Sequence, residues 1–503
     1  MKAGSEQGSE RRGYSRRSFV KRSAGAAAAA GLGAAGGLPG TALAKPKPGG
    51  NPLLNAKPGP LASRKKMLAW NEYLAGLGAR PTGGVSETQF RKDLKKAMQE
   101  LGWETSMRSQ TFTGWEAREY SLSVGAAGAA KEPVNVSYYY PYSGRTPKEG
   151  IAAELAYANR GTPADFMSGD FNGKIAVIDV PPFAIPIGAA FNTWDGSPPD
   201  INPTLPYDRA WVAAGPALAP AIAAGAVGAI IILSQSPPCA NKQYSPFGKE
   251  LQGIPALNVN AVVGERVRAL AQAGGARAKL RLKAKQSPGK TKALLATLPG
   301  ASDEVVVVNS HTDGTNLVEE NGPLAMLSIA QQLSARPRSQ RPVTYAFYFA
   351  TGHFQYEVNS SAAYVTDYPD LFTRTKVGLT IEHLGCPEYL DNHVDEYVKT
   401  GQPEISGLFA TSHSMATAAA PAMTQNGVSR CSVIQPVPKF FGEGRPLYEA
   451  GLPMLAYIAG PNYLLAETGK GKQLERFSID RMMKETKAMA ALLDQLATTS
   501  TFT

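Results

Sequence analysis

Short apolar runs in the C-terminal half of the chain predict the strands of an α/β domain. Each run is apolar at successive positions rather than at every second one, which is typical of strands buried on both faces of a mostly parallel or mixed sheet. The four runs cover residues 305–309, 344–349, 377–381 and 454–458. Three helices are predicted beside them, over 323–333, 404–418 and 479–496. Pro323 suits a first helical position and Ser478 suits an N-cap.

An earlier segment predicts a surface helix that packs on this sheet. Its apolar positions Phe90, Leu94, Ala97 and Leu101 fall on one helical face, and Gly102 follows as a stop. Ser86 and Gln89 have the spacing of a capping box, so we expect the helix to run over 86–101.

The segment between these two regions has a different pattern of residues. Tyrosine and proline clusters alternate with apolar runs over 174–180, 229–233 and 255–259, followed by a helical stretch over 266–273 and a strand over 278–282. We expect a self-contained α+β module over residues 133–285.

Composition restricts the class of protein. The chain has 503 residues, of which 43% are hydrophobic and 18% charged, and this excludes a disordered chain. Three cysteines exclude a disulfide scaffold and a cysteine-based zinc knuckle, and a bridge between two of Cys239, Cys386 and Cys431 is left open. The net charge of +11 raises the question of nucleic-acid binding, so its location matters.

The first 44 residues hold seven Lys and Arg against two Glu, so five of the eleven net charges lie there. Arg16-Arg17-Ser18-Phe19 precedes an Ala/Gly-rich stretch and the small residues Ala42-Leu43-Ala44, which together predict a twin-arginine signal peptide over 1–44. Residues 45–62 are rich in Pro, Lys and Gly and predict a linker with no core to bury. We therefore expect an exported protein that binds no nucleic acid and has no membrane anchor in its mature form.

Histidine is scarce, with five in the chain, and three of them directly follow predicted strands. His311 and Asp313 follow the strand at 305–309, His353 follows 344–349, and Glu382-His383 follow 377–381. Sites in open α/β sheets form at these carboxyl ends. Imidazole and carboxylate groups are the ligands of zinc and similar divalent ions, and Asp313 is placed to orient the His311 ring.

Plainer alternatives exist for some of these residues. His383 is also compatible with a satisfied polar residue beside a buried strand, and Glu319 with a carboxylate at a helix entry. His393 and His413 have no supporting pattern and are interpreted as structural.

These motifs resemble the two-zinc exopeptidase family of bacterial aminopeptidases, plasma glutamate carboxypeptidase and the transferrin-receptor ectodomain. The resemblance covers nearly all of the mature chain. It implies an α/β peptidase-like domain in two parts, over 63–132 and 286–503, with a mixed, mostly parallel sheet flanked by helices. The module over 133–285 resembles the protease-associated domain inserted in many members, with Gly173-Lys174-Ile175 and Gly253-Ile254-Pro255-Ala256 as its turns.

Residue by residue, the resemblance implies roles for the strand-end groups. His311-Thr312-Asp313 matches the family's zinc ligand and its orienting Asp, Glu320 stands at the position of the metal-bridging Asp, and Glu382 at that of a ligand Asp. Two positions depart from the pattern. Gly352-His353-Phe354 stands where the family has Glu-Glu, its general base and a ligand, and residues 461–465 lack the family's last ligand, a His.

Three functions therefore remain open. The first is metal-dependent hydrolysis of a peptide or other amide bond, with one divalent ion, zinc or another, held by His311, Glu320 and either Glu382 or His353. His353 would act as base beside Asp313, and His383 and Glu319 are further candidate ligands. We expect one ion rather than two. The second is a metal-free pseudopeptidase that binds peptides or cell-surface polymer, and the third is a different hydrolase or transferase chemistry.

Overall fold

The structure is a computed structural model, and it describes residues 50–194, 201–211, 215–248, 250–437 and 439–502. The chain divides into two compact units, residues 1–44 and 45–503, and the fold below is that of the second unit. The predicted signal peptide lies outside the described residues.

Fourteen of the described strands form one mixed sheet, and its C-terminal half carries the predicted apolar runs. There the order is β17-β16-β18-β13-β11-β12-β10, in which β11 is parallel to β12 and β13, β13 is parallel to β18, and β10 and β16 are antiparallel to their neighbours β12 and β18. The strands are β10 (Arg277–Leu298), β11 (Val305–His311), β12 (Thr344–Ala350), β13 (Thr375–Ile381), β16 (Ser406–Ala410), β17 (Cys431–Ile434) and β18 (Met454–Ala459).

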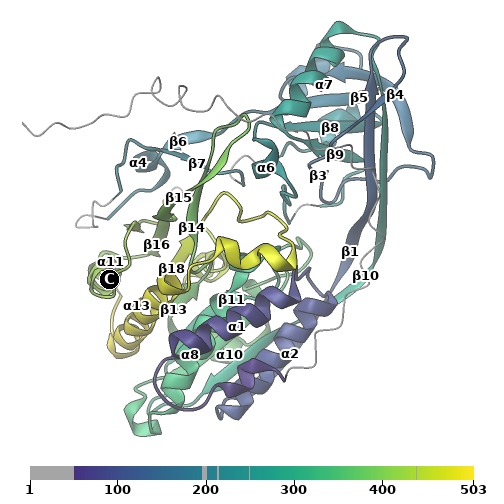
Figure 1. The fold of residues 1–503 in the computed structure, drawn as a ribbon. Helices are drawn as coiled ribbons and strands as arrows, with labels where there is room; N and C mark the ends of the chain where they lie inside the picture. The colour runs from purple at the N-terminus through teal and green to yellow at the C-terminus, as the bar shows by residue number, and fades with distance from the viewer. Residues whose placement is uncertain (1–49, 195–200, 212–214, 249, 438, 503) are drawn as a thin grey trace, which may run out of the picture. The chain divides into compact units, whose positions relative to one another are not determined.

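Both faces of this half are covered, as the uninterrupted apolar runs predict. Val306 and Val308 of β11 face one hydrophobic cluster, while Val305 and Val307 face another on the opposite side. In Figure 1 helices α1, α2 and α8 lie together over one face of the sheet. The helices of this half are α1 (Arg64–Leu77), α2 (Val85–Glu100), α8 (Gly322–Ser334), α9 (Ala362–Asp367), α10 (Pro369–Thr373), α11 (His413–Gln425), α12 (Arg445–Glu449) and α13 (Ile479–Thr498). The predicted fold class is confirmed.

The other half of the sheet belongs to the segment predicted as an inserted module. It continues from β10 in the order β4-β5-β8-β9-β3, with hydrophobic clusters on both faces. Its elements are β2 (Glu132–Val134), β3 (Tyr138–Tyr139), β4 (Ile151–Tyr157), α3 (Pro163–Met167), β5 (Ile175–Val180), α5 (Ala219–Ala223), β8 (Gly228–Leu233), α6 (Pro237–Ala240), β9 (Ala256–Val259) and α7 (Ala261–Ala273). Outside the large sheet lie β6 (Ala184–Pro186), α4 (Ile187–Ala190), β7 (Pro206–Asp208), β14 (Pro387–Asp391) and β15 (Tyr397–Pro403).

Two long strands join the halves. β1 (Glu104–Gly125) and β10 are each 22 residues long, and they pair antiparallel from Glu104 opposite Thr297 to Gly125 opposite Arg277. The predicted module boundary between residues 285 and 286 falls inside β10, where the chain stays extended and hydrogen-bonded. The expectation of a short closing strand over 278–282 is therefore wrong about its length.

Three local predictions differ from the structure. Helix α2 begins one residue early, after Gly84, so Ser86 is not an N-cap, and its hydroxyl donates instead to the Leu77 carbonyl at 3.1 Å. Residues 404–418 are not one helix, because Ser406–Ala410 pair as strand β16 before α11 begins at His413. Residues 50–60 are not a coreless linker, since the 3₁₀ turn Pro52–Asn55 places Leu53 in the core.

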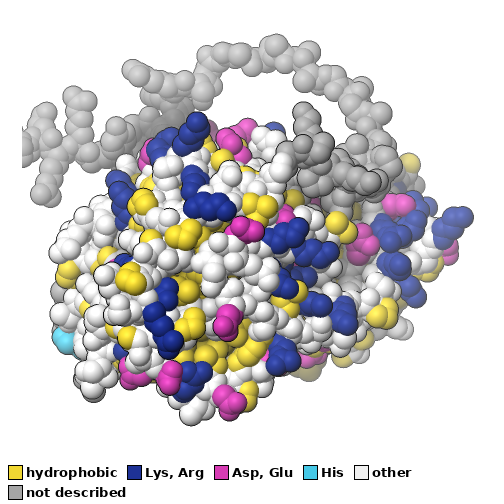
Figure 2. All heavy atoms as spheres, turned by 90° about the horizontal axis from the view of Figure 1, so that it is seen from below, with side chains coloured by type: hydrophobic (Ala, Val, Ile, Leu, Met, Phe, Trp, Pro, Cys, Tyr) yellow, Lys and Arg dark blue, Asp and Glu magenta, His cyan; other side chains and the backbone are white. Residues whose placement is uncertain are grey.

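The surface is mixed in charge. On the face shown in Figure 2, Lys and Arg side chains lie among acidic and uncharged ones. Within the described residues, no helix combines the length and apolar character needed to cross a membrane.

Candidate metal centre

The candidate site lies where three parallel strands end side by side. β11 ends at His311, β12 leads into the segment that carries His353, and β13 leads into Glu382 and His383. The register pairs His311 with Ala350 of β12 and Asn309 with Thr380 of β13, so the carboxyl ends of the strands are level with one another. The structure brings together every one of these strand-end groups that the sequence singled out.

His311 is fixed with one ring nitrogen free. Its Nδ1 lies 2.8 Å from the backbone oxygen of Asp313 and 3.5 Å from the Asp313 carboxylate. A carbonyl only accepts, so Nδ1 carries the hydrogen and the neutral ring presents its lone pair at Nε2. Burial lowers the pKa of His311, and the neighbouring His353 lowers it further, which favours the neutral form.

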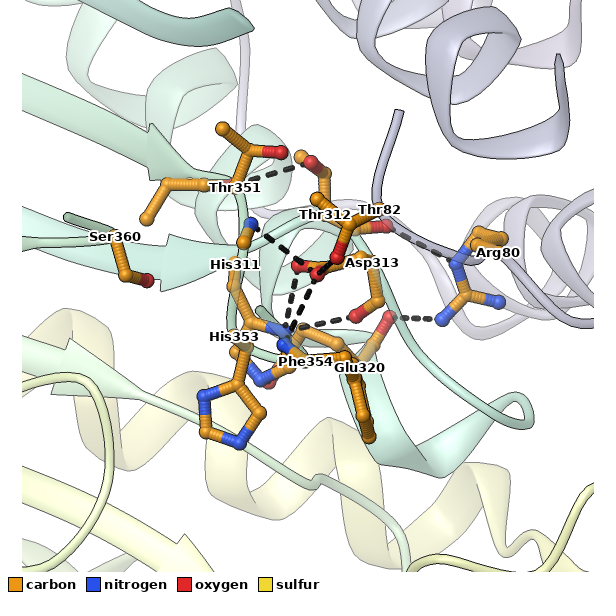
Figure 3. Close-up of polar contacts among 12 residues, drawn as sticks. Arg80, Thr82, His311, Thr312, Asp313, Glu320, Thr351, His353, Phe354 and Ser360 are labelled. Atoms are coloured by element: carbon orange, nitrogen blue, oxygen red, sulfur yellow. Dashed lines mark hydrogen bonds and ion pairs between the residues drawn. The ribbon is translucent and has the colours of Figure 1, made fainter. Parts of the chain in front are cut away.

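Asp313 orients His311 and also fastens the loops around it. Its Oδ2 accepts hydrogen bonds from Thr82 Oγ1 at 2.5 Å, Gly352 N at 3.2 Å and Phe354 N at 3.4 Å (Figure 3). Burial opposes ionisation of this carboxyl, but the interactions with His311 and Thr82 outweigh it and lower its pKa to about 2. Asp313 is therefore a charged group beside the His311 ring.

A buried arginine shapes the loop that follows. The Arg80 guanidinium donates to the carbonyl oxygens of Thr312 at 3.2 Å, Asn316 at 3.0 Å and Glu320 at 3.0 Å. Figure 3 shows this side chain reaching toward Glu320 from the segment before α2. The Gly322 amide donates to Glu320 Oε1, which leaves Oε2 of that carboxylate as the outer atom. Burial raises the pKa of Glu320 well above its ordinary value, and the nearby Glu382 raises it further.

Glu382 and His383 reach the same point although they are adjacent in the chain. His383 has a left-handed backbone conformation, φ +58°, which is uncommon outside glycine and redirects its side chain. Its Nδ1 lies 2.8 Å from the Ala459 carbonyl, so this ring too presents its lone pair at Nε2. Burial lowers the pKa of His383 well below its ordinary value, and His311 lowers it further. Burial raises the pKa of Glu382 to about 8, with the charge of Glu443 as the second cause.

Four buried residues form a group that could hold a metal ion. One ligand atom from each of His311, Glu320, Glu382 and His383 lies within 4.8 Å of the others, and all four residues are buried. His311 Nε2 is 3.2 Å from Glu320 Oε2, and His383 Nε2 is 3.8 Å from Oε2 of both Glu320 and Glu382. Among the described residues, none of these four atoms has a hydrogen-bond partner. Buried polar atoms without a partner are costly, so a set of two nitrogens and two oxygens aimed at one point fits a divalent ion such as zinc.

Glu319 and His353 lie beside this centre. Ligand atoms of His311, Glu319 and His353 also lie within 4.8 Å of one another. Both Glu319 oxygens are buried with no partner in the part of the chain that the structure describes, and burial raises the pKa of this carboxyl well above its usual range. The His353 ring stacks on His311, with centroids 4.2 Å apart, and on Phe247 at 5.3 Å.

The predicted base role of His353 rested on an unperturbed pKa, and the structure differs on this point. Nδ1 of His353 lies 2.8 Å from Oε1 of Glu443. Burial of the ring disfavours its charge, but the hydrogen bond and charge of Glu443 prevail and raise the pKa of His353 to about 10. The metal-free protein therefore holds this ring protonated at neutral pH. Glu443 was not predicted from the sequence, because its loop carries no periodic or motif signal.

The two departures from the family pattern have structural roles. Phe354 is buried, and its carbonyl accepts a hydrogen bond from Tyr142. The carbonyl oxygens of Tyr463 and Leu464 accept from Asn316 Nδ2 at 3.1 and 2.8 Å, so this segment fastens the loop that carries Glu320.

The remaining candidates lie elsewhere. His393 Nε2 pairs with Asp208 Oδ2 at 2.5 Å, and His413 begins α11. Cys239, Cys386 and Cys431 are buried, and in the part of the chain that the structure describes no disulfide joins any two of them.

Comparison with known proteins identifies the fold. No family model and no curated protein matches the chain. Three of the similar solved structures are an aminopeptidase from Aneurinibacillus sp. strain AM-1, the zinc aminopeptidase BSAP from Bacillus subtilis and a Peptidase M28 precursor from Shewanella amazonensis. Their identities are 14%, 17% and 15%, and their TM-scores 0.57, 0.59 and 0.61. The matches cover 88%, 86% and 87% of this chain and 95%, 95% and 98% of those chains. At such identities the likeness shows the fold, which is the one that the resemblance implied.

Proposed function

We propose that the protein is a metal-dependent hydrolase of peptide or other amide bonds, and that it binds one divalent ion through His311, Glu320, Glu382 and His383. One observation carries this proposal: four ligand atoms, buried and without partners among the described residues, converge within 4.8 Å. The aminopeptidase fold supports it, because in open α/β sheets the carboxyl ends of strands are where sites form.

We favour one ion over two because the second group of candidate ligands is not independent of the first. His311 is common to both groups, and its Nδ1 is already committed to Asp313, so only Nε2 remains. A single imidazole nitrogen holds one ion. Phe354, at the position of an expected carboxylate ligand, offers no donor atom from its side chain.

The residues of this chain have distinct tasks in the proposed reaction. When bound, a divalent ion supplies Lewis acidity for the scissile carbonyl and lowers the pKa of water to about 7. His311 and His383 are held as neutral ligands by the carbonyls behind them, so these two rings need not turn before they bind the ion. Arg80 keeps the loop that carries Glu320 in place.

Two groups remain to move protons. Glu319 faces the site with both oxygens unpaired among the described residues and is the group we propose to accept the proton of the attacking water. His353, whose Nδ1 is held by Glu443, exchanges protons at Nε2 and is proposed to donate to the leaving amine.

Elemental analysis of the purified protein tests this proposal. We expect about one zinc or other transition-metal ion per chain, and hydrolysis of at least one substrate in a panel of aminoacyl-nitroanilides and simple amides. His311→Ala should lose both the metal and the activity, whereas His413→Ala, at an exposed position on α11, should keep both. Absence of metal after loading contradicts the proposal.

A binding protein without catalysis is the second candidate, and one observation favours it. A buried phenylalanine, Phe354, stands at a position where the resemblance implies a ligand. Absence of bound metal together with absence of hydrolysis of every substrate in the panel would support this alternative.

We also propose that the protein acts outside the cytoplasm after twin-arginine export. The supporting features are Arg16-Arg17 and the small residues at 42–44. Replacing both arginines by lysine should retain the full-length precursor in the cytoplasm. Unchanged export would contradict this proposal.

A further inference from the structure

A single carboxylate joins the proton-carrying ring to the rest of the site. Glu443 lies in the loop between β17 and α12, and its side chain is 4% exposed. Its carboxylate accepts hydrogen bonds from His353 Nδ1 at 2.8 Å, Ser360 Oγ at 2.7 Å and the Ser361 amide at 3.1 Å. The Ser361 hydroxyl adds another bond at 2.5 Å. A carboxylate held by this many donors has one orientation, and it fixes the His353 ring with it.

The backbone of the same residue reaches a proposed metal ligand. The Glu443 amide donates to Glu382 Oε1 at 2.6 Å. That contact occupies Oε1 and leaves Oε2 as the atom facing the ion, just as the Gly322 amide does for Glu320. The Glu443 carbonyl in turn accepts from Asn309 Nδ2 of β11 at 3.0 Å.

The neighbouring glycine makes this approach possible. Gly442 has φ +78°, and a Cβ placed on it would lie 2.6 Å from Glu382 Oε1. Only glycine combines that backbone conformation with so close a contact. The loop therefore brings the Glu443 amide against Glu382 through a position that excludes a side chain.

We propose that Glu443 is a positioning residue with two separate arms: its carboxylate sets the orientation of His353, and its backbone amide sets the ligand atom of Glu382. This inference rests on the proposed function, in which His353 donates a proton and Glu382 is a metal ligand. The contacts themselves predict that the two arms respond to different substitutions.

Glu443→Gln tests the carboxylate arm, because it keeps the backbone amide and nearly the same volume. We expect the zinc dissociation constant to change by less than about threefold, while kcat falls by roughly tenfold or more with KM little changed. In metal-free protein labelled with ¹⁵N-histidine, the Nδ1–H resonance of His353, assigned with His353→Gln, should move or disappear. Ser360→Ala, which removes one donor to the carboxylate, should shift the same resonance by less.

Gly442→Ala tests the amide arm and should give the opposite pattern. We expect zinc affinity to fall by about 10–100-fold while the His353 resonance of the metal-free protein stays in place. If this variant does not fold, as judged by circular dichroism, Asn309→Ser replaces it. Because Asn309 Nδ2 also donates to Ser361 Oγ at 2.9 Å, Ser361→Ala is the matched control for that variant.

The proposal is overturned if Glu443→Gln leaves the His353 resonance unchanged, or if it weakens zinc binding as much as Gly442→Ala does. A protein that binds no zinc at all refutes the proposed function instead. In that event the resonance comparison, which uses metal-free protein, still decides whether Glu443 holds His353.

Discussion

Glu382 Oε2 and His383 Nε2 lie 3.8 Å apart, although the two residues are consecutive and follow a strand. Successive side chains in an extended chain point to opposite faces, so this convergence depends on the positive φ of His383. The turn converts one strand end into two candidate ligands.

His383→Ala should therefore weaken metal binding strongly. Loss of a direct ligand is expected to raise the zinc dissociation constant by more than the roughly 10–100-fold that follows loss of an outer hydrogen-bond partner. Competition with a chromogenic chelator measures the constant, and His413→Ala serves as the matched histidine control. Equal affinity in the two variants would remove His383 from the ligand set.

Asp313→Asn should weaken metal binding less than His383→Ala does, and it should also slow the reaction. The carboxylate lies 3.5 Å from His311 Nδ1 and receives the Thr82 hydroxyl, so the substitution removes charge while keeping the size of the side chain. We expect about 10–100-fold weaker zinc binding, measured by the same competition. Thr82→Ser preserves the hydroxyl and should stay close to the unmutated protein; a comparable loss in that variant would point to packing rather than charge.

Arg80→Met should lower the stability of the folded protein even when no metal is bound. The substitution leaves buried carbonyl oxygens of Thr312, Asn316 and Glu320 without their charged donor, and hydrogen bonds to charged groups contribute about 1.5–3 kcal/mol each. We expect the free energy of unfolding of the metal-free protein to fall by at least about 3 kcal/mol in urea titrations. Arg145→Met, at an exposed position, controls for the loss of an arginine. A loss below about 1 kcal/mol would show that other donors or water replace the guanidinium.

His393 should make stability depend on alkaline pH. The hydrogen bond to Asp208 is the main cause that raises the pKa of His393 to about 9. Because the folded-state pKa exceeds the ordinary value of about 6.5, the stabilisation is fully present below pH 6.5 and is lost as the pH rises through about 9. His393 is only half-buried, so we expect no more than about 1 kcal/mol.

The comparison of unmutated protein with His393→Gln at pH 6 and pH 10 isolates this effect. The difference in free energy of unfolding between the two proteins should shrink at the higher pH. A difference that is the same at both values would show that the ion pair with Asp208 contributes nothing to the folded state.

Sequence patterns were sufficient for the strands and for most of the site. β11, β12, β13 and β18 are buried on both faces, so their apolar runs are long and uninterrupted. The polar residues that follow these runs had to meet, because parallel strands end at the same edge. The strands could thus be predicted from the composition of each run, and most of the candidate site from the position of each histidine.

The remaining features depend on tertiary contacts that leave no local pattern. Glu443 is one carboxylate in a loop rich in Gly and Pro, and its role appears only when the loop meets β13. The apolar stretch at 405–410 is compatible with helix or strand, and pairing with β18 decided the outcome. The lone pairs of His311 and His383 are set by backbone carbonyls, and a backbone carbonyl has no signature in the sequence.

The ladder between β1 and β10 has a consequence for how this chain could be divided. An inserted module that is connected by two loops can be removed or exchanged by cutting the chain in those loops, or released by proteolysis there. Here the two connections are the interiors of two paired strands. One end of β10 pairs with β4, and its other end pairs with β12, the strand that leads to His353. Residue 285 is paired with Glu116 of β1, so a cut there leaves the two halves joined through the ladder between β1 and β10.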